Sequence, residues 1–139
     1  MRLLLFHFPE FSFKTHSRVV PDAPDDCREG RVESAVVVFE RAEPKDEADA
    51  GGVETKLSRN VKRLAGRFVT RTVAIDRLAG FSHLGSEPAP PEFARGVLDR
   101  ARARPEAVGH REEATPFGHF CGWRLSVAGE SLAQIRKEL

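Results

Sequence analysis

Cysteine is scarce in this sequence, and no group of residues has the spacing of a metal site. Cys27 and Cys121 are the only cysteines, and no CxxC pair occurs. So few cysteines exclude a disulfide framework and are typical of a reducing, cytoplasmic setting. The five histidines are dispersed along the chain. We therefore expect neither a metal nor a cofactor.

Long hydrophobic runs are absent as well. The first apolar segment, residues 3–8, is too short for a signal peptide or a membrane span, so we interpret it as a buried strand and expect no membrane partner. The 139 residues are 40% hydrophobic and 31% charged, which predicts a single globular domain, 1–139. Its last residues continue a helical pattern without a cap, which suggests a domain excised from a longer chain.

The common catalytic signatures are missing too. The sequence has no glycine-rich phosphate loop, no HExxH helix and no nucleophile elbow. These absences argue against a P-loop nucleotidase, a zinc protease of that type and an α/β-hydrolase. The net charge of +1 says nothing about nucleic acid by itself, so only local clusters of basic residues are informative.

What is present is a pattern in which strands outnumber helices. Strands are predicted over 3–8 and 11–15 (a possible hairpin), 31–42, 68–75, 107–115 and 119–127. Helices are predicted over 54–67, from 91 to the proline at 105, and over a last segment holding Leu132, Ile135 and Leu139. Residues 43–52 are interpreted as a charged connector. This order predicts an α+β fold with three helices on a mixed or mostly antiparallel sheet.

The first predicted helix has a basic face. Its apolar residues fall on one side, and the other side carries Lys56, Arg59, Lys62, Arg63 and Arg67. Such a face could meet phosphate groups. The plainer interpretation is a solvated helix surface.

A short loop, residues 80–87, stands between a predicted strand and a proline-rich helix start. His83 lies at its middle, with Gly80 and Gly85 on either side. Glycines let a ligand approach the backbone, and histidine titrates near neutral pH. The loop is therefore a candidate site, although a histidine with only a structural role would fit the same pattern.

The ordered motifs of the chain resemble the N-terminal editing domain of archaeal threonyl-tRNA synthetase. The resemblance rests on Phe81-Ser82-His83-Leu84, on Pro116-Phe117-Gly118-His119-Phe120, on Leu132-Ala133-Gln134 and on the opening seven residues. It implies the barrel-like fold of D-aminoacyl-tRNA deacylases, a homodimer, and linkage to synthetase domains.

The resemblance also implies an activity. Such a domain hydrolyses serine wrongly attached to the threonine tRNA, at the 3′ aminoacyl end, without a metal or a covalent intermediate. The terminal ribose 2′-hydroxyl helps to activate the water. Serine differs from threonine by one methyl group, worth only ~1–3 kcal/mol in a pocket, so a second selection step is needed.

The family's site residues carry over in part. His83 is implied to order the ribose or the water, and Gly80, Phe81 and Ser82 to contact substrate through the backbone. Further substrate-binding candidates are the 116–120 motif, with Pro116, Phe117, Gly118 and His119, and Ala42, which is implied to lie in the pocket wall. Where the family has tyrosine, lysine and glutamate, this sequence has Phe120, Cys121 and Gln134. The charged helpers are therefore absent.

Three alternatives stay open at this stage. Cys121 and His83 could form a nucleophilic pair that passes through a thioester, although an ordinary strand cysteine is favoured. The chain could be a D-aminoacyl-tRNA deacylase. It could also be a non-catalytic tRNA-binding or dimerisation module.

Overall fold

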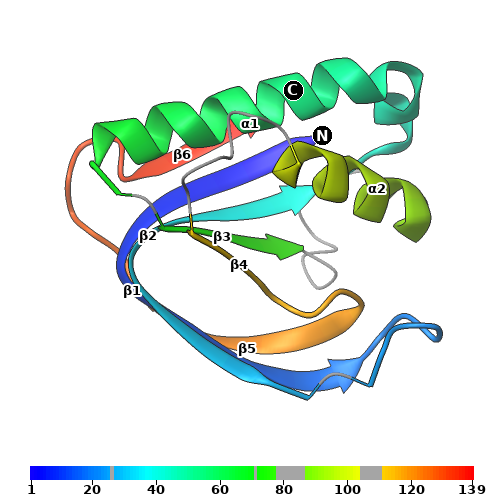
Figure 1. Cartoon of the computed structure of the whole chain (residues 1–139), viewed down its shortest axis with the longest axis horizontal. Coiled ribbons are helices and arrows are strands. Elements are labelled where there is room, and N and C mark those ends of the chain that lie inside the picture. Colours follow the sequence, from blue (N-terminus) through cyan, green and yellow to red (C-terminus); the bar gives the residue numbers. More distant parts are fainter. Residues whose placement is uncertain (26, 71, 78–86, 104–110) are drawn as a thin grey trace.

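The fold is a strongly curved sheet with two helices on its outer face. The computed structural model describes residues 1–25, 27–70, 72–77, 87–103 and 111–139. The described elements are β1 (Arg2–Arg18), β2 (Glu29–Arg41), the 3-10 helix η1 (Pro44–Asp49), α1 (Ala50–Arg67), β3 (Thr72–Arg77), α2 (Pro91–Arg102), β4 (Arg111–Ala114), β5 (His119–Ser126) and β6 (Gln134–Glu138). Figure 1 shows the sheet curling below the helix layer.

The long strand β1 organises the sheet. In the described part of the chain, six strands form one sheet in the order β4-β3-β2-β1-β5, and β6 also pairs with β1. Strand β1 is antiparallel to β2 along nearly its whole length. On its other side its first residues pair with β6 and its later residues with β5. Strands β2, β3 and β4 run parallel. The sheet is therefore mixed, as predicted.

The side-chain alternation of the β1–β2 ribbon reverses at Pro9 and Ser34. The residue pairing runs from Phe8 opposite Ala35 to Glu10 opposite Glu33 and skips the intervening pair. Proline has no N–H to donate, and Ser34 has a φ of 47°. As a result Phe8 and Phe11, three residues apart, both enter the same inner cluster. The reversal lets one ribbon line the inside of a curved sheet at both of its ends.

The two faces of the sheet carry separate hydrophobic clusters. The outer cluster lies between the helices and the sheet and includes Leu3, Leu5, Leu57 and Leu98. The inner cluster is largely aromatic and comprises Phe8, Phe11, Phe13, Val32, Ala35, Val37, Phe39 and Ala74, with Leu4, Phe6, Cys121 and Trp123 packed against it. Its neighbouring rings contact one another at centroid distances of 5.3–6.2 Å, some stacked and others edge to face. These contacts explain why residues 35–39 are buried on both faces.

The two helices begin with capping signals and pack on each other. The side chain of Asp49 accepts a hydrogen bond from the Gly52 amide at the start of α1. Helix α2 begins at Pro91, as predicted, where a missing N–H costs nothing. Arg100 of α2 donates to the buried Glu54 of α1 at 2.6 Å. These contacts orient both helices over the first half of β1.

Several predictions about the fold were wrong. Segments 3–8 and 11–15 belong to one strand rather than a hairpin, because Pro9 sits at the reversal and does not end β1. The connector at 43–52 is η1 and the first turn of α1. The sheet is curved but open, not a closed barrel, and the described residues form two α-helices rather than three.

The predicted last helix is strand β6. Leu132, Ile135 and Leu139 have helical spacing, yet residues 134–138 alternate between exposed and half-buried. The first residues of β1 offer a free edge that supplies backbone partners to this segment. Tertiary pairing therefore overrides the local helical pattern.

Candidate active site

A cavity of about 730 Å³ opens where the two ends of the curved sheet face each other. Its size suits a small ligand. The lining residues are Val19, Val20, Glu40, Arg41, Ala42, Pro44, Glu47, Glu87, Pro88, Ala89, Pro90, Pro91, Ala94, Phe117 and Gly118. They come from the end of β2, from η1, from the segment before α2 and its first residues, and from two turns at the far end of the β1–β5 pair. The cavity thus joins residues that are distant in the sequence.

The end of β2 forms one rim of the cavity, here called the upper rim. This rim includes Ala42, one of the predicted pocket residues. Ala42 is buried, and its carbonyl accepts a hydrogen bond of 3.0 Å from the Ala89 amide. This bond ties the end of β2 to the segment that follows the predicted His83 loop. That loop, with Gly80, Phe81, Ser82 and His83, lies outside the described residues, but the segment resumes at Glu87 on the rim.

The lower rim is the predicted Pro-Phe-Gly turn. Gly118 has a φ of 77°, and its carbonyl accepts hydrogen bonds from the amides of Val19 and Val20 at 2.8 and 3.2 Å. A Cβ atom at Gly118 would lie 2.6 Å from that of Ala23. Glycine is therefore required here both by its conformation and by the close packing.

The two residues flanking this turn are buried. Pro116 and His119 are both buried, and the Nδ1 atom of His119 lies 3.2 Å from the Phe117 carbonyl oxygen. His119 thus holds the shape of the turn, while Phe117 and Gly118 line the cavity.

Charged residues line the cavity beside its apolar walls. Glu40 and Arg41 are buried, whereas Glu47 and Glu87 are exposed at the opening. Three carboxyl groups beside one guanidinium favour a ligand that carries a positive charge.

An ionic cluster beneath η1 supports the upper rim. The α-ammonium of Met1 contacts the buried Asp46 and lies 3.6 Å from Glu43, which also pairs with Arg2 at 3.0 Å. Asp46 accepts a hydrogen bond from the Glu43 amide as well. These contacts fix the turn that leads from Ala42 into η1.

A more exposed ion pair extends this cluster to β6. Lys45 reaches Glu138 at 3.0 Å. Hydrogen bonds to Glu138 and Glu43 raise the pKa of Lys45, and the bond from Lys45 lowers the pKa of Glu138.

Besides Pro116 and His119, which flank the turn, three predicted site residues are absent from the cavity lining. Phe120 is exposed, Cys121 is half-buried against the inner aromatic cluster, and Gln134 is exposed on β6. Cys121 pairs with Thr15, whereas Gln134 pairs with Phe6, nine residues earlier on β1. The cavity therefore gathers Ala42, Phe117 and Gly118, but not Cys121 or Gln134.

Part of the cavity wall was not predicted from the sequence. Val19 and Val20 follow the polar end of β1, and their only signal was their place just before Pro21. Glu40 and Arg41 end a predicted strand, but their approach to residues 117–118 depends on the curvature of the sheet. No local pattern predicts that curvature.

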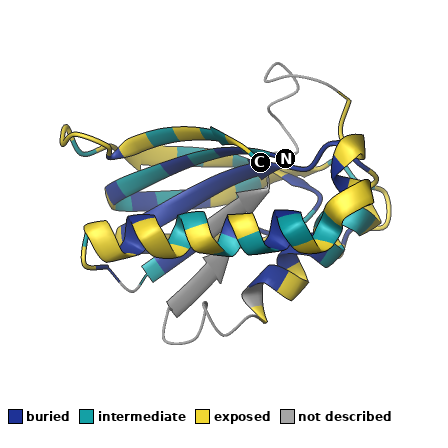
Figure 2. Ribbon diagram, turned by 90° about the horizontal axis from the view of Figure 1, so that it is seen from above, coloured by how far each residue is buried: buried dark blue, intermediate teal, exposed yellow. Residues whose placement is uncertain are grey.

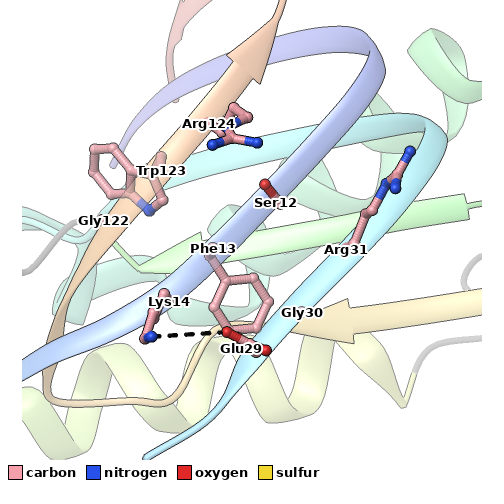
Figure 3. Close-up of a pocket in the computed structure, with 9 residues that line it drawn as sticks. All are labelled: Ser12, Phe13, Lys14, Glu29, Gly30, Arg31, Gly122, Trp123 and Arg124. Atoms are coloured by element: carbon pink, nitrogen blue, oxygen red, sulfur yellow. Dashed lines mark ion pairs between the residues drawn. The ribbon is translucent and has the colours of Figure 1, made fainter.

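A second cavity of about 580 Å³ lies on the uncovered outer face of β1, β2 and β5. Figure 3 shows Ser12, Lys14, Arg31 and Arg124 around it. Here Lys14 pairs with Glu29 at 3.9 Å, and Arg31 pairs with Glu10 and Glu33 at 2.8 and 2.9 Å. Because most of its charges are paired, this surface is a weaker candidate for a binding site.

The described residues contain neither a metal-binding cluster nor a membrane-spanning helix. No cluster of three or more His, Cys, Asp or Glu side chains there could hold a metal ion. None of the described helices is long and apolar enough to cross a bilayer.

One solved structure resembles this fold along its full length. The c-Myc DNA Unwinding Element Binding Protein superposes with a TM-score of 0.59 at 12% sequence identity, covering 100% of this chain and 99% of its own. At this identity the likeness shows a shared fold and carries no functional conclusion.

Similar sequences are threonine–tRNA ligases. Those of Methanoregula boonei and Thermococcus onnurineus are 29% and 28% identical over 139 and 142 residues. Each alignment covers 100% of this chain and 22% of the relative, so the chain spans about a fifth of their length. The family model described as the archaea-specific editing domain of threonyl-tRNA synthetase matches residues 1–139. The chain therefore belongs to this family of editing domains.

Proposed function

We propose that this domain hydrolyses the ester of serine wrongly attached to the threonine tRNA. The observation that carries the proposal is the match of the editing-domain family over all 139 residues. The cavity supports it, because Ala42, Phe117 and Gly118 line one space next to the segment that follows the His83 loop. The products are free serine and a tRNA that can be charged again.

The proposed reaction needs little side-chain chemistry. A water attacks the ester carbonyl, the terminal ribose 2′-hydroxyl assists its activation, and the 3′ oxygen of the ribose leaves. His83 would order the ribose or the water, and the backbone of Gly80, Phe81 and Ser82 would hold the substrate. The carboxylates that line the cavity, above all the buried Glu40, would bind the α-ammonium group of the seryl ester. Gln134 is uncharged and would not offer this anionic contact.

Selectivity for serine would arise from size. Since a methyl group is worth only ~1–3 kcal/mol of attraction, a pocket rejects threonine best by leaving no room for it. Ala42 and Ala89 are buried and line the cavity, and in this proposal their close-packed backbone would form part of that boundary.

The test is deacylation of Ser-tRNA(Thr) beside Thr-tRNA(Thr), with a 2′-deoxy terminal adenosine as control. Rapid loss of serine, retention of threonine and an inert 2′-deoxy substrate are expected. Cleavage of D-aminoacyl esters in place of L-seryl ester would assign the domain to D-aminoacyl-tRNA deacylation. Binding of tRNA without turnover would leave a non-catalytic module, in which loss of the lysine, tyrosine and glutamate has silenced the site.

Replacing Cys121 with alanine tests the thioester route separately. The half-buried place of Cys121 against aromatic side chains suits an ordinary strand cysteine. We expect the Cys121→Ala variant to retain hydrolysis within about twofold, whereas a loss of 10²-fold or more would support a nucleophilic cysteine.

The homodimer is also a proposal. Strand β5 is a sheet edge that exposes Leu125, and Val127 beyond its end is exposed too, so a second copy could cover this edge. Sedimentation equilibrium of the domain measures the oligomeric state directly.

A further inference from the structure

Helix α1 carries a row of basic side chains that no described acidic residue neutralises. Lys56, Arg59, Lys62, Arg63 and Arg67 are all exposed. The only acidic residue within α1, Glu54, is buried and pairs with Arg100. Within the described residues, none of the five basic side chains forms an ion pair.

The row is narrow and straight. At 100° per residue, Lys56, Arg59, Arg63 and Arg67 fall within an arc of roughly 80°, with Lys62 beside them. Their Cα atoms span about 17 Å along the helix axis at 1.5 Å per residue. Figure 2 shows α1 lying across the helix side of the molecule, with exposed positions recurring along it.

The other helix provides an internal contrast. On α2, Arg100 pairs with Glu54 at 2.6 Å and Arg95 lies 3.9 Å from Asp99. Of the basic residues on the second cavity, Lys14 and Arg31 also have acidic partners, whereas Arg124 forms no ion pair with a described residue. Among the described elements, α1 therefore carries the largest group of basic side chains without an ion pair.

The row starts near the proposed active site and leads away from it. Pro44 and Glu47 of η1 line the cavity, and α1 follows η1 directly. Lys56 is six residues after the first residue of α1, or about 9 Å along its axis. A nucleic acid whose 3′ end occupied the cavity could therefore lay its adjoining backbone along α1.

We propose that the basic row of α1 binds the phosphate backbone of the tRNA whose aminoacyl end occupies the cavity. This inference rests on the proposed function for the identity of the RNA. A regular row of exposed cations on one helix face suits the repeating phosphates of a nucleic-acid backbone, so we assign these side chains to phosphate contacts, which position the tRNA and do not select its sequence.

The test compares two triple variants of the 139-residue chain. Lys56→Gln/Arg59→Gln/Arg63→Gln removes charge from α1 with residues of similar helix propensity. Lys14→Gln/Arg124→Gln/Arg136→Gln removes the same charge from exposed positions on the strands. Binding of uncharged threonine tRNA is measured for both variants and the wild type between 50 and 200 mM salt, and circular dichroism checks that each is folded.

The α1 variant should bind tRNA about tenfold or more weakly, and its slope of log K against log salt should fall by about 2–3. The strand variant should bind within about threefold of the wild type, since its three substituted residues lie on the strands and not along α1. Equal losses in both variants would overturn the proposal, because they would indicate diffuse attraction to total charge. Wild-type binding by the α1 variant would overturn it as well and would favour a protein partner for this face.

Hydrolysis of seryl-adenosine, which lacks the RNA backbone, separates this proposal from the proposed function. The α1 variant should cleave it at the wild-type rate while cleaving Ser-tRNA(Thr) more slowly at low enzyme concentration. If the wild type cleaves neither substrate, the proposed function fails, yet the binding comparison still decides whether α1 holds RNA.

Discussion

The two halves of the β1–β2 ribbon are both antiparallel pairs, but they differ in how many of their faces are buried. In the first half, residues 35–39 of β2 are buried on both faces, under the helices outside and against the aromatic cluster inside. In the second half, only the inner face is buried, and Ser12, Lys14 and Arg31 line an open outer surface (Figure 3). Covering by the helices, rather than strand pairing, therefore decides what each position contributes to stability.

The largest expected effect comes from the covered half. Leu5 and Lys14 both point outward from β1, but Leu5 is 1% exposed whereas Lys14 is open to solvent. Leu5→Ala should lower the free energy of unfolding by about 3 kcal/mol, since it leaves a cavity under α1. Lys14→Ala should change it by less than about 0.5 kcal/mol. Urea titration measures both, and equal losses would contradict the contrast.

Gly118→Ala should destabilise the Pro-Phe-Gly turn, which lies at the end of the uncovered half of the ribbon and forms the lower rim of the cavity. A φ of 77° and the 2.6 Å approach to the Ala23 Cβ atom oppose a side chain there, so we expect a loss of about 2 kcal/mol. Displacement of the lower rim should also reduce seryl ester hydrolysis about tenfold or more. Gly129→Ala is the matched control, because its Cβ atom would contact nothing within 4 Å.

Gly30→Ala tests the inner face of the uncovered half. Its Cβ atom would lie 2.5 Å from the ring of Phe13, which would have to shift within the aromatic cluster. A loss of about 1–2 kcal/mol is expected. Gly122→Ala on β5, whose nearest neighbour would be the Lys14 carbonyl oxygen at 3.9 Å, should be nearly neutral. A near-UV circular dichroism change in the first variant alone would confirm the displacement of aromatic rings.

Val69→Gly should stabilise the protein, in contrast to the preceding substitutions. Val69 follows α1, is 91% exposed and has a φ of 52°, a left-handed conformation that is costly for a β-branched residue. Its amide still bonds the Gly66 carbonyl, as at a helix end that usually takes glycine. We expect a gain of about 1 kcal/mol in thermal or urea unfolding. A loss would show that Val69 makes a contact in solution that offsets its strain.

The smallest effect concerns the pH dependence of the link between β6 and η1. The bond from Lys45 lowers the pKa of Glu138, so this carboxylate adds stability at neutral pH that is lost as the pH falls through its acidic titration. The raised pKa of Lys45 means that its share is lost only at strongly alkaline pH. Glu138→Gln should lower Tm slightly at pH 7 and leave it unchanged near pH 2. A constant difference at both pH values would exclude this ion pair as the cause.

The sequence predicts the parts of this fold whose signals are local. Continuous apolar runs such as 35–39, the one-sided helix 54–67 and Pro91 at a helix start were all confirmed within a few residues. The errors occurred where distant pairing decides. Pro9 suggested a turn but lies inside β1. Ile135 falls at helical spacing from Leu132 and Leu139, but its segment pairs with the edge of β1.

The candidate site was predictable to a similar degree. Ala42, Phe117 and Gly118 came from the family resemblance, and the cavity contains all three. Glu40, Arg41, Val19 and Val20 were not predicted, because their meeting depends on the curvature of the whole sheet. The roles of His83 and its loop stay predictions.

The pairing of β1 with β6 has a consequence for synthesis on the ribosome. Within this domain β1 emerges before every other strand, but one pairing partner of its residues 2–6 is formed by residues 134–138. At roughly 5–20 residues per second, that edge waits on the order of 7–30 s before it is covered. During this interval β2 can already pair with one edge of residues 3–5, but their other edge stays open to other nascent chains. The speed of translation and early chaperone contact would therefore govern how much of this domain reaches its native state.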